Sequence, residues 1–466
     1  MRSEIDTYKE FLKRNNITSP DNAHLIRVLL LDRGERYDTS ASSIKSLWEN
    51  HIKKNPDSDI EFYNHIPYCF QKCHFCCYPS VELQNDLEMS EYIDKLINFY
   101  RFFGKTFENF RFSDLSIGGG TPSLLSSRQM EKLLTELFST FKFKKGVQWS
   151  IEFNPQSSSK DKLEVVKKFG FNRVSFGVQS FNKKALNLNK RSYQTYEMVK
   201  DVLQDAKNVG FDTVNIDLLV GLYGDDSEGF AESFRKATEL KPDTIYIYSL
   251  KPGNRYLSDV CKMSQTEFFD WKEKVMESAS DQISTIAQEN GYNIPYSSTS
   301  EIGMRQFGTL IFNKKDFQYS QRITRKGGSK SSVFGLGTFS HSYIKDKIYY
   351  KSRSPLIENP SDYKFSASLY EEKKEMLTQI CYSLTFKGSV SRKRFKEMFG
   401  KDLFEEFGEA IDKIKKLRVA RTDEDGFYIK DSFKDNWMLF FLFFFGQDQI
   451  TKLLANDSIA IKGNQR

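Results

Sequence analysis

The chain has 466 residues, of which 39% are apolar and 15% aromatic, so it has enough apolar side chains for two or three packed domains. The N-terminal segment MRSEIDTYKEFLKRNN has no apolar core of the signal-peptide kind, and the longest apolar run, residues 437–445, is well short of the roughly 20 residues that a membrane-spanning helix needs. These features predict a cytoplasmic protein with no membrane span and with reduced cysteines. The net charge of +7 is spread along the chain, so no nucleic-acid partner is expected.

Between residues 59 and 255, short β-branched and aromatic runs alternate with longer amphipathic stretches. This alternation predicts repeated strand–helix units around a parallel sheet. Helices fit between the strands at residues 129–141, 196–209 and 227–240, and Gly210 stands where a helix should end. Six strands are expected, at residues 60–66, 114–117, 148–153, 173–178, 213–219 and 244–250.

The rest of the chain has a different pattern. A helix is expected at residues 265–290, followed by a poorly periodic region that contains FGLGTFSHSY and the strand-like KDKIYYKS. Residues 371–433 predict three helices and a short hairpin at DEDGFYIKD, which together indicate a winged-helix-like module. Such modules bind DNA in some proteins and serve as lids or dimer surfaces in others, so the module does not define a function. The apolar run at 437–445 is interpreted as a buried helix face, with a docking or membrane-surface patch as the alternative.

These patterns divide the chain into four predicted domains. They are an N-terminal extension (1–58), a strand–helix core (59–255), a barrel extension on the substrate side (256–362) and the C-terminal helical, winged-helix-like domain (363–466).

Four of the six cysteines lie within nine residues, directly after the first predicted strand. Cys69, Cys73 and Cys76 have the spacing C-x3-C-x2-C. A structural zinc site usually takes four ligands in two separated C-x2-C pairs, and the two remaining cysteines of the chain form no second pair, although His65 or His74 would allow zinc. Three thiolates on one loop suit a [4Fe–4S] cluster in which one iron is left open.

The other unusual segments also lie at predicted strands. GGGTPS follows the second strand, EFNP ends the third, GVQS ends the fourth and NIDLL lies in the fifth. Because parallel strands bring their carboxyl ends to one edge of a sheet, these segments are expected to lie close together. The ordered set resembles the radical S-adenosylmethionine (SAM) superfamily, in particular the oxygen-independent coproporphyrinogen III oxidase branch with its haem-chaperone and class C methyltransferase relatives. This resemblance extends over residues 61–250 and implies an α/β fold with a partial (β/α)6 barrel before the winged-helix-like module.

The resemblance implies a [4Fe–4S] cluster held by Cys69, Cys73 and Cys76, with SAM bound to the open iron. One electron from the reduced cluster then cleaves SAM to methionine and a 5′-deoxyadenosyl radical, which modifies an organic substrate. The resemblance also implies a small-molecule substrate and an electron donor of the flavodoxin or ferredoxin type.

By the same resemblance, residues at successive strand ends contact SAM. Gly118, Gly119 and Gly120 allow the methionyl amino group to approach the backbone, and Arg191 can bind a carboxylate through two N–H groups. Tyr63 matches a residue near the sulfonium or a second SAM. The expected SAM contacts are Tyr63, Phe75, Gly119, Gly120, Thr121, Glu152, Gln179, Arg191 and Asp217, and no catalytic residue is assigned.

The sequence departs from these relatives in two places. Cys77 directly follows Cys76, so the two side chains point differently, and Cys77 is interpreted as non-ligating. Tyr78 stands where coproporphyrinogen oxidases carry a further cysteine, and DFQYSQRITRKGG lacks the haem-chaperone signature. These departures favour carbon methylation or alkylation, with a second SAM, over coproporphyrinogen decarboxylation in haem biosynthesis. Haem binding or delivery is a further alternative.

Overall fold

The computed structural model describes residues 36–293, 309–314, 332–387, 389–416, 418, 420–430 and 441–445. Within these ranges one sheet has thirteen strands, in the order β1-β17-β16-β15-β14-β2-β6-β8-β9-β10-β11-β13-β12. The six predicted strands form its centre, and each pairs with the next in parallel. They are β2 (Ile60–Ile66), β6 (Asp114–Gly119), β8 (Trp149–Phe153), β9 (Arg173–Gln179), β10 (Thr213–Val220) and β11 (Thr244–Ser249).

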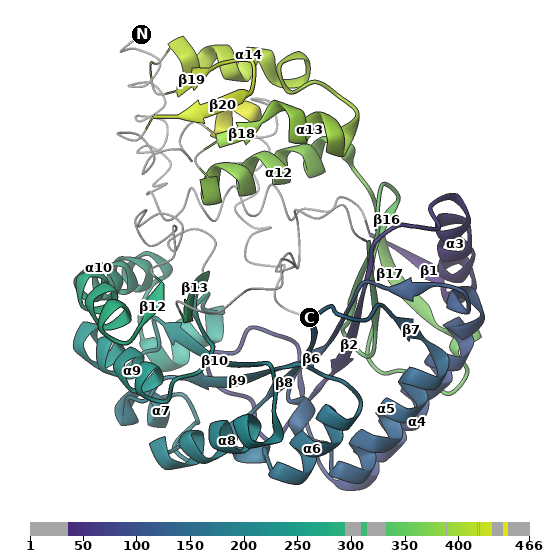
Figure 1. The fold of residues 1–466 in the computed structure, drawn as a ribbon, viewed down its shortest axis with the longest axis vertical. Coiled ribbons are helices and arrows are strands. Elements are labelled where there is room, and N and C mark those ends of the chain that lie inside the picture. Colours follow the sequence, from purple (N-terminus) through teal and green to yellow (C-terminus); the bar gives the residue numbers. More distant parts are fainter. Residues whose placement is uncertain are drawn as a thin grey trace.

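The helices between these strands lie on the convex outer side of a curved sheet, which confirms the partial barrel (Figure 1). The helix expected at 196–209 has those bounds, and it ends at Gly210, whose φ of +86° is a conformation that glycine adopts without strain. The outer helices are α4 (Asp86–Gly104), α5 (Ser127–Thr140), α6 (Lys160–Lys168), α7 (Lys183–Leu188), α8 (Tyr196–Val209) and α9 (Ser227–Glu239).

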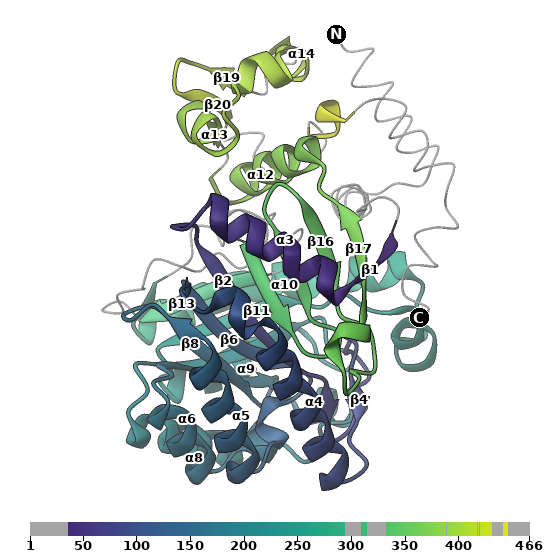
Figure 2. The ribbon, with the colours of Figure 1, turned by 90° about the vertical axis from the view of Figure 1, so that its right-hand side faces the viewer.

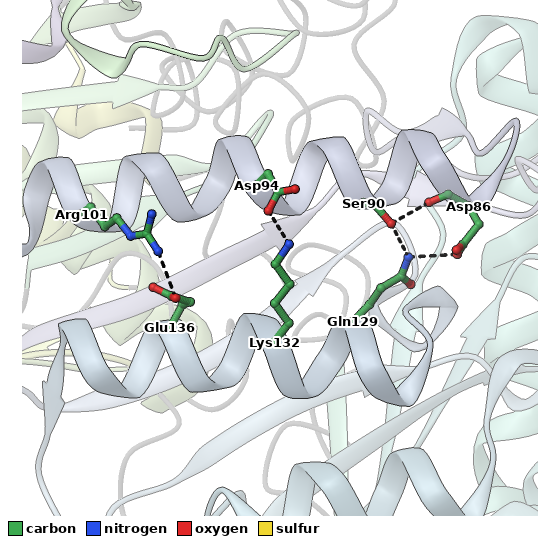
Figure 3. Close-up of polar contacts among 7 residues, drawn as sticks. All are labelled: Asp86, Ser90, Asp94, Arg101, Gln129, Lys132 and Glu136. Carbon is green, nitrogen blue, oxygen red and sulfur yellow. Dashed lines mark hydrogen bonds and ion pairs between the residues drawn. The ribbon is translucent and has the colours of Figure 1, made fainter.

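Polar contacts between α4 and α5 show how neighbouring strand–helix units are aligned (Figure 3). The Gln129 amide donates to the Asp86 carboxylate over 2.9 Å and to the Ser90 hydroxyl over 3.0 Å, and Lys132 pairs with Asp94. Arg101 and Glu136 form an ion pair of 3.0 Å further along both helices. Because residue numbers rise together along the two helices, α4 and α5 run parallel, as repeated strand–helix–strand units require.

Further strands extend both sides of the parallel centre. On one side β13 (Thr309–Lys314) pairs antiparallel with β11, followed by β12 (Tyr292–Asn293), and α10 (Gln265–Glu289) confirms the helix expected there. On the other side β14 (Ser332–Leu336) pairs with β2, and the antiparallel strands β15 (His341–Ile344), β16 (Ile348–Lys351), β17 (Lys364–Leu369) and β1 (Tyr37–Ser40) follow.

The helix α3 (Ala41–Lys54) lies beside β16 and β17 (Figure 2). Its Trp48 is fully buried in the same apolar core as the barrel strands, and the Trp48 indole N–H donates to the Tyr350 hydroxyl over 2.7 Å. Residues on both sides of the predicted boundaries at 58 and 255 therefore share one core, and the four-domain division stays a prediction.

The C-terminal module has its own apolar core and lies apart from the large sheet (Figure 2). The strands β18 (Ser389–Ser391), β19 (Ala420–Thr422) and β20 (Gly426–Ile429) form an antiparallel sheet beside α12 (Glu372–Lys387), α13 (Arg392–Phe399) and α14 (Leu403–Lys416). The three predicted helices and the hairpin are confirmed. Phe441, Phe444 and Phe445 are buried in this core, whereas residues 437–440 lie outside the described ranges. No helix in the described part of the chain is long and apolar enough to cross a membrane.

Candidate functional site

The cysteine loop begins where β2 reaches the carboxyl edge of the sheet. The short strands β3 (Tyr68–Cys69) and β4 (Val81–Glu82) pair in parallel and close the base of the loop. The Val81 amide donates to the Pro67 carbonyl and the Leu83 amide to the Cys69 carbonyl, each over 2.9 Å. Within the loop, the Cys76 amide donates to the Cys73 carbonyl over 3.1 Å. These backbone bonds hold Cys69, Cys73 and Cys76 in one compact segment.

The three thiols are half-buried, and two of them contact other segments of the chain. The Thr121 hydroxyl donates to the Cys69 sulfur over 3.5 Å, and the Arg191 guanidinium donates to the Cys73 sulfur over 3.7 Å. Burial raises the pKa of the Cys69 thiol and raises that of Cys76 to about 11. A bound cation reverses this preference for the neutral thiol, since a metal-coordinating thiol loses its proton. Cys77 is exposed, so its environment differs from that of Cys76.

The glycines of GGGTPS are packed against the β2 strand and the cysteine loop. A Cβ atom on Gly120 would lie 2.5 Å from the Tyr68 carbonyl oxygen, and one on Gly119 would lie 2.7 Å from the Ile66 carbonyl oxygen. A Cβ atom on Gly118 would meet the Glu152 carboxylate at 2.6 Å. Gly119 also has a φ of +120°, which disfavours any other residue. The structure therefore requires these glycines for contacts within the protein, in addition to any contact with a ligand.

Arg191 connects the cysteine loop to the end of β9. Its Nη2 donates to the Gly177 carbonyl over 2.6 Å and to the Gln194 side-chain oxygen over 2.8 Å. Its buried Nε has no hydrogen-bond acceptor within the described residues. Gln179, beside Gly177, has a φ of +72°, a strained conformation for a residue other than glycine. Arg191 thus adjoins the cysteine loop and keeps one buried donor that no described residue satisfies.

Three of the predicted residues, Tyr63, Glu152 and Asp217, lie on the central strands β2, β8 and β10. The Tyr63 hydroxyl and the His65 Nδ1 are 2.9 Å apart on β2. Glu152 on β8 pairs in register with Ser175, whose hydroxyl donates to the Asp217 carboxylate over 2.9 Å. Burial raises the pKa of Asp217 to about 6, and Glu152 contributes as a nearby like charge.

Phe75 lies on a different side of the loop from these polar residues. It is buried in an apolar cluster with Leu250, Leu257 and Phe268, and Cys73 and Cys76 pack against this cluster. The cluster therefore keeps water from one side of the cysteine loop. The predicted contact of Phe75 with SAM stays a prediction.

Sequence reasoning missed the residues that hold the predicted ones in place. Gln194 binds Arg191 and also donates to the carbonyls of Val178 and Ser180. The Asn215 amide donates to Asp217 over 2.7 Å. These side chains follow the predicted strands or lie within them, but no motif distinguishes them from ordinary polar residues, so their roles could not be predicted.

The donor set suits an iron–sulfur cluster with a SAM molecule. Within the described ranges, no three His, Cys, Asp or Glu side chains are grouped closely enough to hold a single metal ion. A [4Fe–4S] cluster takes each cysteine at a different iron, so its ligands need not converge on one ion. The free donor on Arg191 is complementary to a ligand carboxylate such as that of SAM. The residues present therefore fit both groups.

Comparison with known proteins identifies the same part of the chain. Residues 63–237 match the family model described as the radical SAM superfamily. The oxygen-independent coproporphyrinogen III oxidase of Salmonella typhimurium is 34% identical over 198 residues, which are 42% of this chain and 43% of that protein. The alignment thus spans less than half of the length of this relative. The haem chaperone HemW of Lactococcus lactis is 26% identical over 380 residues, which are 79% of this chain and 93% of the chaperone.

The fold agrees with that of a solved relative. The structure of Escherichia coli coproporphyrinogen III oxidase has a TM-score of 0.71 to this chain at 22% identity, and the match covers 86% of this chain and 93% of that one. This likeness confirms the partial-barrel fold. The cysteine loop, the three glycines, Arg191 and Asp217 all lie within residues 63–237. This segment is therefore similar to the radical SAM superfamily, and its relatives include coproporphyrinogen oxidases and haem chaperones.

Proposed function

We propose that this chain is an enzyme that binds a [4Fe–4S] cluster and SAM at the carboxyl edge of its sheet and removes hydrogen from an organic substrate. The observation that carries the proposal is the position of Arg191, which contacts the Cys73 sulfur and keeps a buried Nε without a described acceptor. One residue thus adjoins both the expected cluster and the expected carboxylate of SAM.

Each cofactor has proposed ligands. Cys69, Cys73 and Cys76 would hold the cluster and leave one iron open for SAM. When bound and reduced, the pair supplies one-electron cleavage of a carbon–sulfur bond and, through it, hydrogen abstraction from substrate. Gly119 and Gly120 would leave room for the SAM amino group beside the backbone.

The remaining residues position SAM and substrate. Arg191 neutralises the SAM carboxylate, and because its other N–H groups are fixed by Gly177 and Gln194, little side-chain entropy is lost on binding. Glu152 and Asp217 accept hydrogen bonds from SAM hydroxyl or amino groups. The apolar cluster around Phe75 excludes water from the reactive centre.

Three reactions are compatible with this site. The names of the relatives support oxidative decarboxylation of a coproporphyrinogen-like substrate, and the haem chaperones, which align over most of their length, support haem binding as a second candidate. Carbon methylation or alkylation with a second SAM rests on the sequence alone, since Tyr78 replaces a cysteine of the oxidases. We place decarboxylation first because named relatives support it. The same proposal gives this chain a small-molecule substrate, an electron donor of the flavodoxin or ferredoxin type and a cytoplasmic location.

Anaerobic reconstitution of the full chain with iron and sulfide tests the proposal. Reduction with dithionite in the presence of SAM should yield 5′-deoxyadenosine, and the Cys73→Ala variant should yield none. Wild-type product no higher than that of the variant would reject radical chemistry. With porphyrinogen as substrate, a loss of carbon dioxide supports decarboxylation, whereas a gain of one carbon unit supports alkylation. Stoichiometric haem binding without SAM cleavage supports delivery.

A further inference from the structure

We propose that the outer surface of the cysteine loop is the docking surface for a small acidic protein that carries one electron. This inference rests on the proposed function, because such a partner is needed only if the loop holds a redox cluster. We define the loop face as Phe70, Lys72, Tyr78, Lys184, Leu188 and Lys190.

The loop face exposes unusually large apolar side chains. Phe70 is 69% exposed, Tyr78 is 65% exposed and Leu188 is 40% exposed. Phe70 directly follows Cys69 and Tyr78 lies two residues after Cys76. Leu188 belongs to α7, whose Ala185 is buried in the same apolar cluster as Phe75. Exposed aromatic residues grouped on one surface are typical of protein–protein contacts.

The two segments of the loop face are joined by a hydrogen bond. The Gln71 side-chain amide donates to the Lys190 carbonyl over 2.8 Å, although the residues are 119 positions apart in the chain. The loop base is also fixed by the pairing of β3 with β4. The surface is therefore preorganised, which lowers the entropy cost of binding a partner.

The charge of the loop face is positive. Residues 69–81 and 183–190 contain Lys72, Lys183, Lys184 and Lys190 and no aspartate or glutamate. Acidic groups do adjoin it, since the Glu82 carboxylate accepts a hydrogen bond from the Lys72 amide and Asp259 interacts with His74. The lysines outnumber these carboxylates, so the surface is complementary to an acidic partner.

The position of the loop face argues for an electron carrier rather than a substrate protein. Cys73 and Cys76 lie within the loop itself, whereas Arg191, Gly120 and Asp217 lie toward the sheet. A carrier on the loop face would be near the cluster without blocking substrate. In the transfer, the carrier is oxidised by one electron and the cluster is reduced by one, and no bond forms or breaks. Because transfer slows steeply with distance, this close approach favours the reaction.

Binding of an acidic flavodoxin to the reconstituted full chain tests the inference. We expect the Kd to rise at least 10-fold between 20 and 200 mM salt, since exposed charges are screened. The variants Phe70→Ser and Lys184→Glu/Lys190→Glu should each raise the Kd at least 10-fold at low salt. Lys393→Glu/Lys396→Glu on α13 changes the charge equally at exposed positions outside the loop face, and its Kd should stay within twofold of wild type.

A kinetic readout separates docking from cofactor loss. The loop-face variants should need at least 10-fold more reduced flavodoxin for half-maximal 5′-deoxyadenosine formation and should keep their rate with dithionite. Unchanged flavodoxin binding in both loop-face variants, or equal weakening in the α13 control, would overturn the inference. If wild type cleaves no SAM even with dithionite, the proposed function fails, and the binding titration still decides whether the loop face recognises an acidic protein.

Discussion

Replacement of Gly120 by alanine perturbs the point where the three glycines meet the cysteine loop. The added Cβ would lie 2.5 Å from the Tyr68 carbonyl oxygen and 2.9 Å from the Pro67 carbonyl carbon. Both contacts are with backbone, so no side-chain rotation relieves them. To reach an ordinary contact of 3.4 Å, the Tyr68 carbonyl would have to recede by about 0.9 Å, the difference between 3.4 and 2.5 Å.

The cost of this movement can be estimated from the contacts that oppose it. Overpacking of one methyl group costs about 1–3 kcal/mol. The Gly120 amide donates to the Ile66 carbonyl over 2.7 Å, and loss of this bond would add about 1 kcal/mol. We therefore expect the free energy of unfolding to fall by about 2–4 kcal/mol. Since Cys69 follows Tyr68 directly, its sulfur would move by an amount larger than the roughly 0.2 Å that metal-ligand distances tolerate.

Urea denaturation of the cofactor-free chain measures the stability change, and the iron content after reconstitution measures cluster binding. Gly408→Ala in α14 is the control, because its Cβ would meet nothing within 4 Å. We expect Gly120→Ala to lose stability and most bound iron, and Gly408→Ala to keep both. If Gly120→Ala has wild-type stability and iron content, the argument from close backbone contact is wrong.

Three further predictions test other parts of the structure. Arg191→Lys keeps the charge but removes the buried Nε donor, so SAM affinity should fall at least 10-fold in equilibrium dialysis. Unchanged affinity would refute the proposed carboxylate contact. Burial raises the pKa of Asp225 from 3.8 to about 6, so this carboxyl stabilises the fold below pH 4 and the stabilisation is lost as the pH rises through 6. Between pH 4 and 7.5, the free energy of unfolding of wild type should therefore fall by up to about 3 kcal/mol relative to that of Asp225→Asn, as measured by urea titration. Parallel pH profiles of the two proteins would contradict this. Trp48→Ala should lower stability by about 3–5 kcal/mol in one cooperative transition, whereas a separate early transition would indicate that α3 folds independently of the barrel.

The sequence was sufficient to predict the parallel centre of the fold because its signals are local. Alternating apolar runs and helix-capping residues recur at each strand–helix unit, and all six expected strands are present. The close approach of the segments at the strand ends could also be predicted. In the structure, Thr121 contacts Cys69 and Arg191 contacts Cys73. In each case the residue type and its distance from a strand end were enough to indicate the location.

The outer strands of the sheet could not be predicted in the same way. β14 pairs in parallel with β2 although more than 260 residues separate them, and β1 joins the sheet through β17. Such pairing depends on which edge of the parallel sheet is left open after its central strands have formed. No local sequence pattern predicts which distant strand will pair there. For the same reason, the sequence did not reveal that Trp48, within the predicted N-terminal extension, shares the core of the barrel strands.

The contacts of the three thiols also explain why the cysteine motif does not make a site by itself. The Cys69 sulfur accepts from Thr121, which follows β6, and the Cys73 sulfur accepts from Arg191, which is fixed by Gly177 on β9. Two of the three proposed cluster ligands are therefore held through strands that are not neighbours of the loop in sequence. Because β6 and β9 take their positions from the whole parallel sheet, cluster binding should be lost whenever the sheet unfolds, even if the loop remains intact.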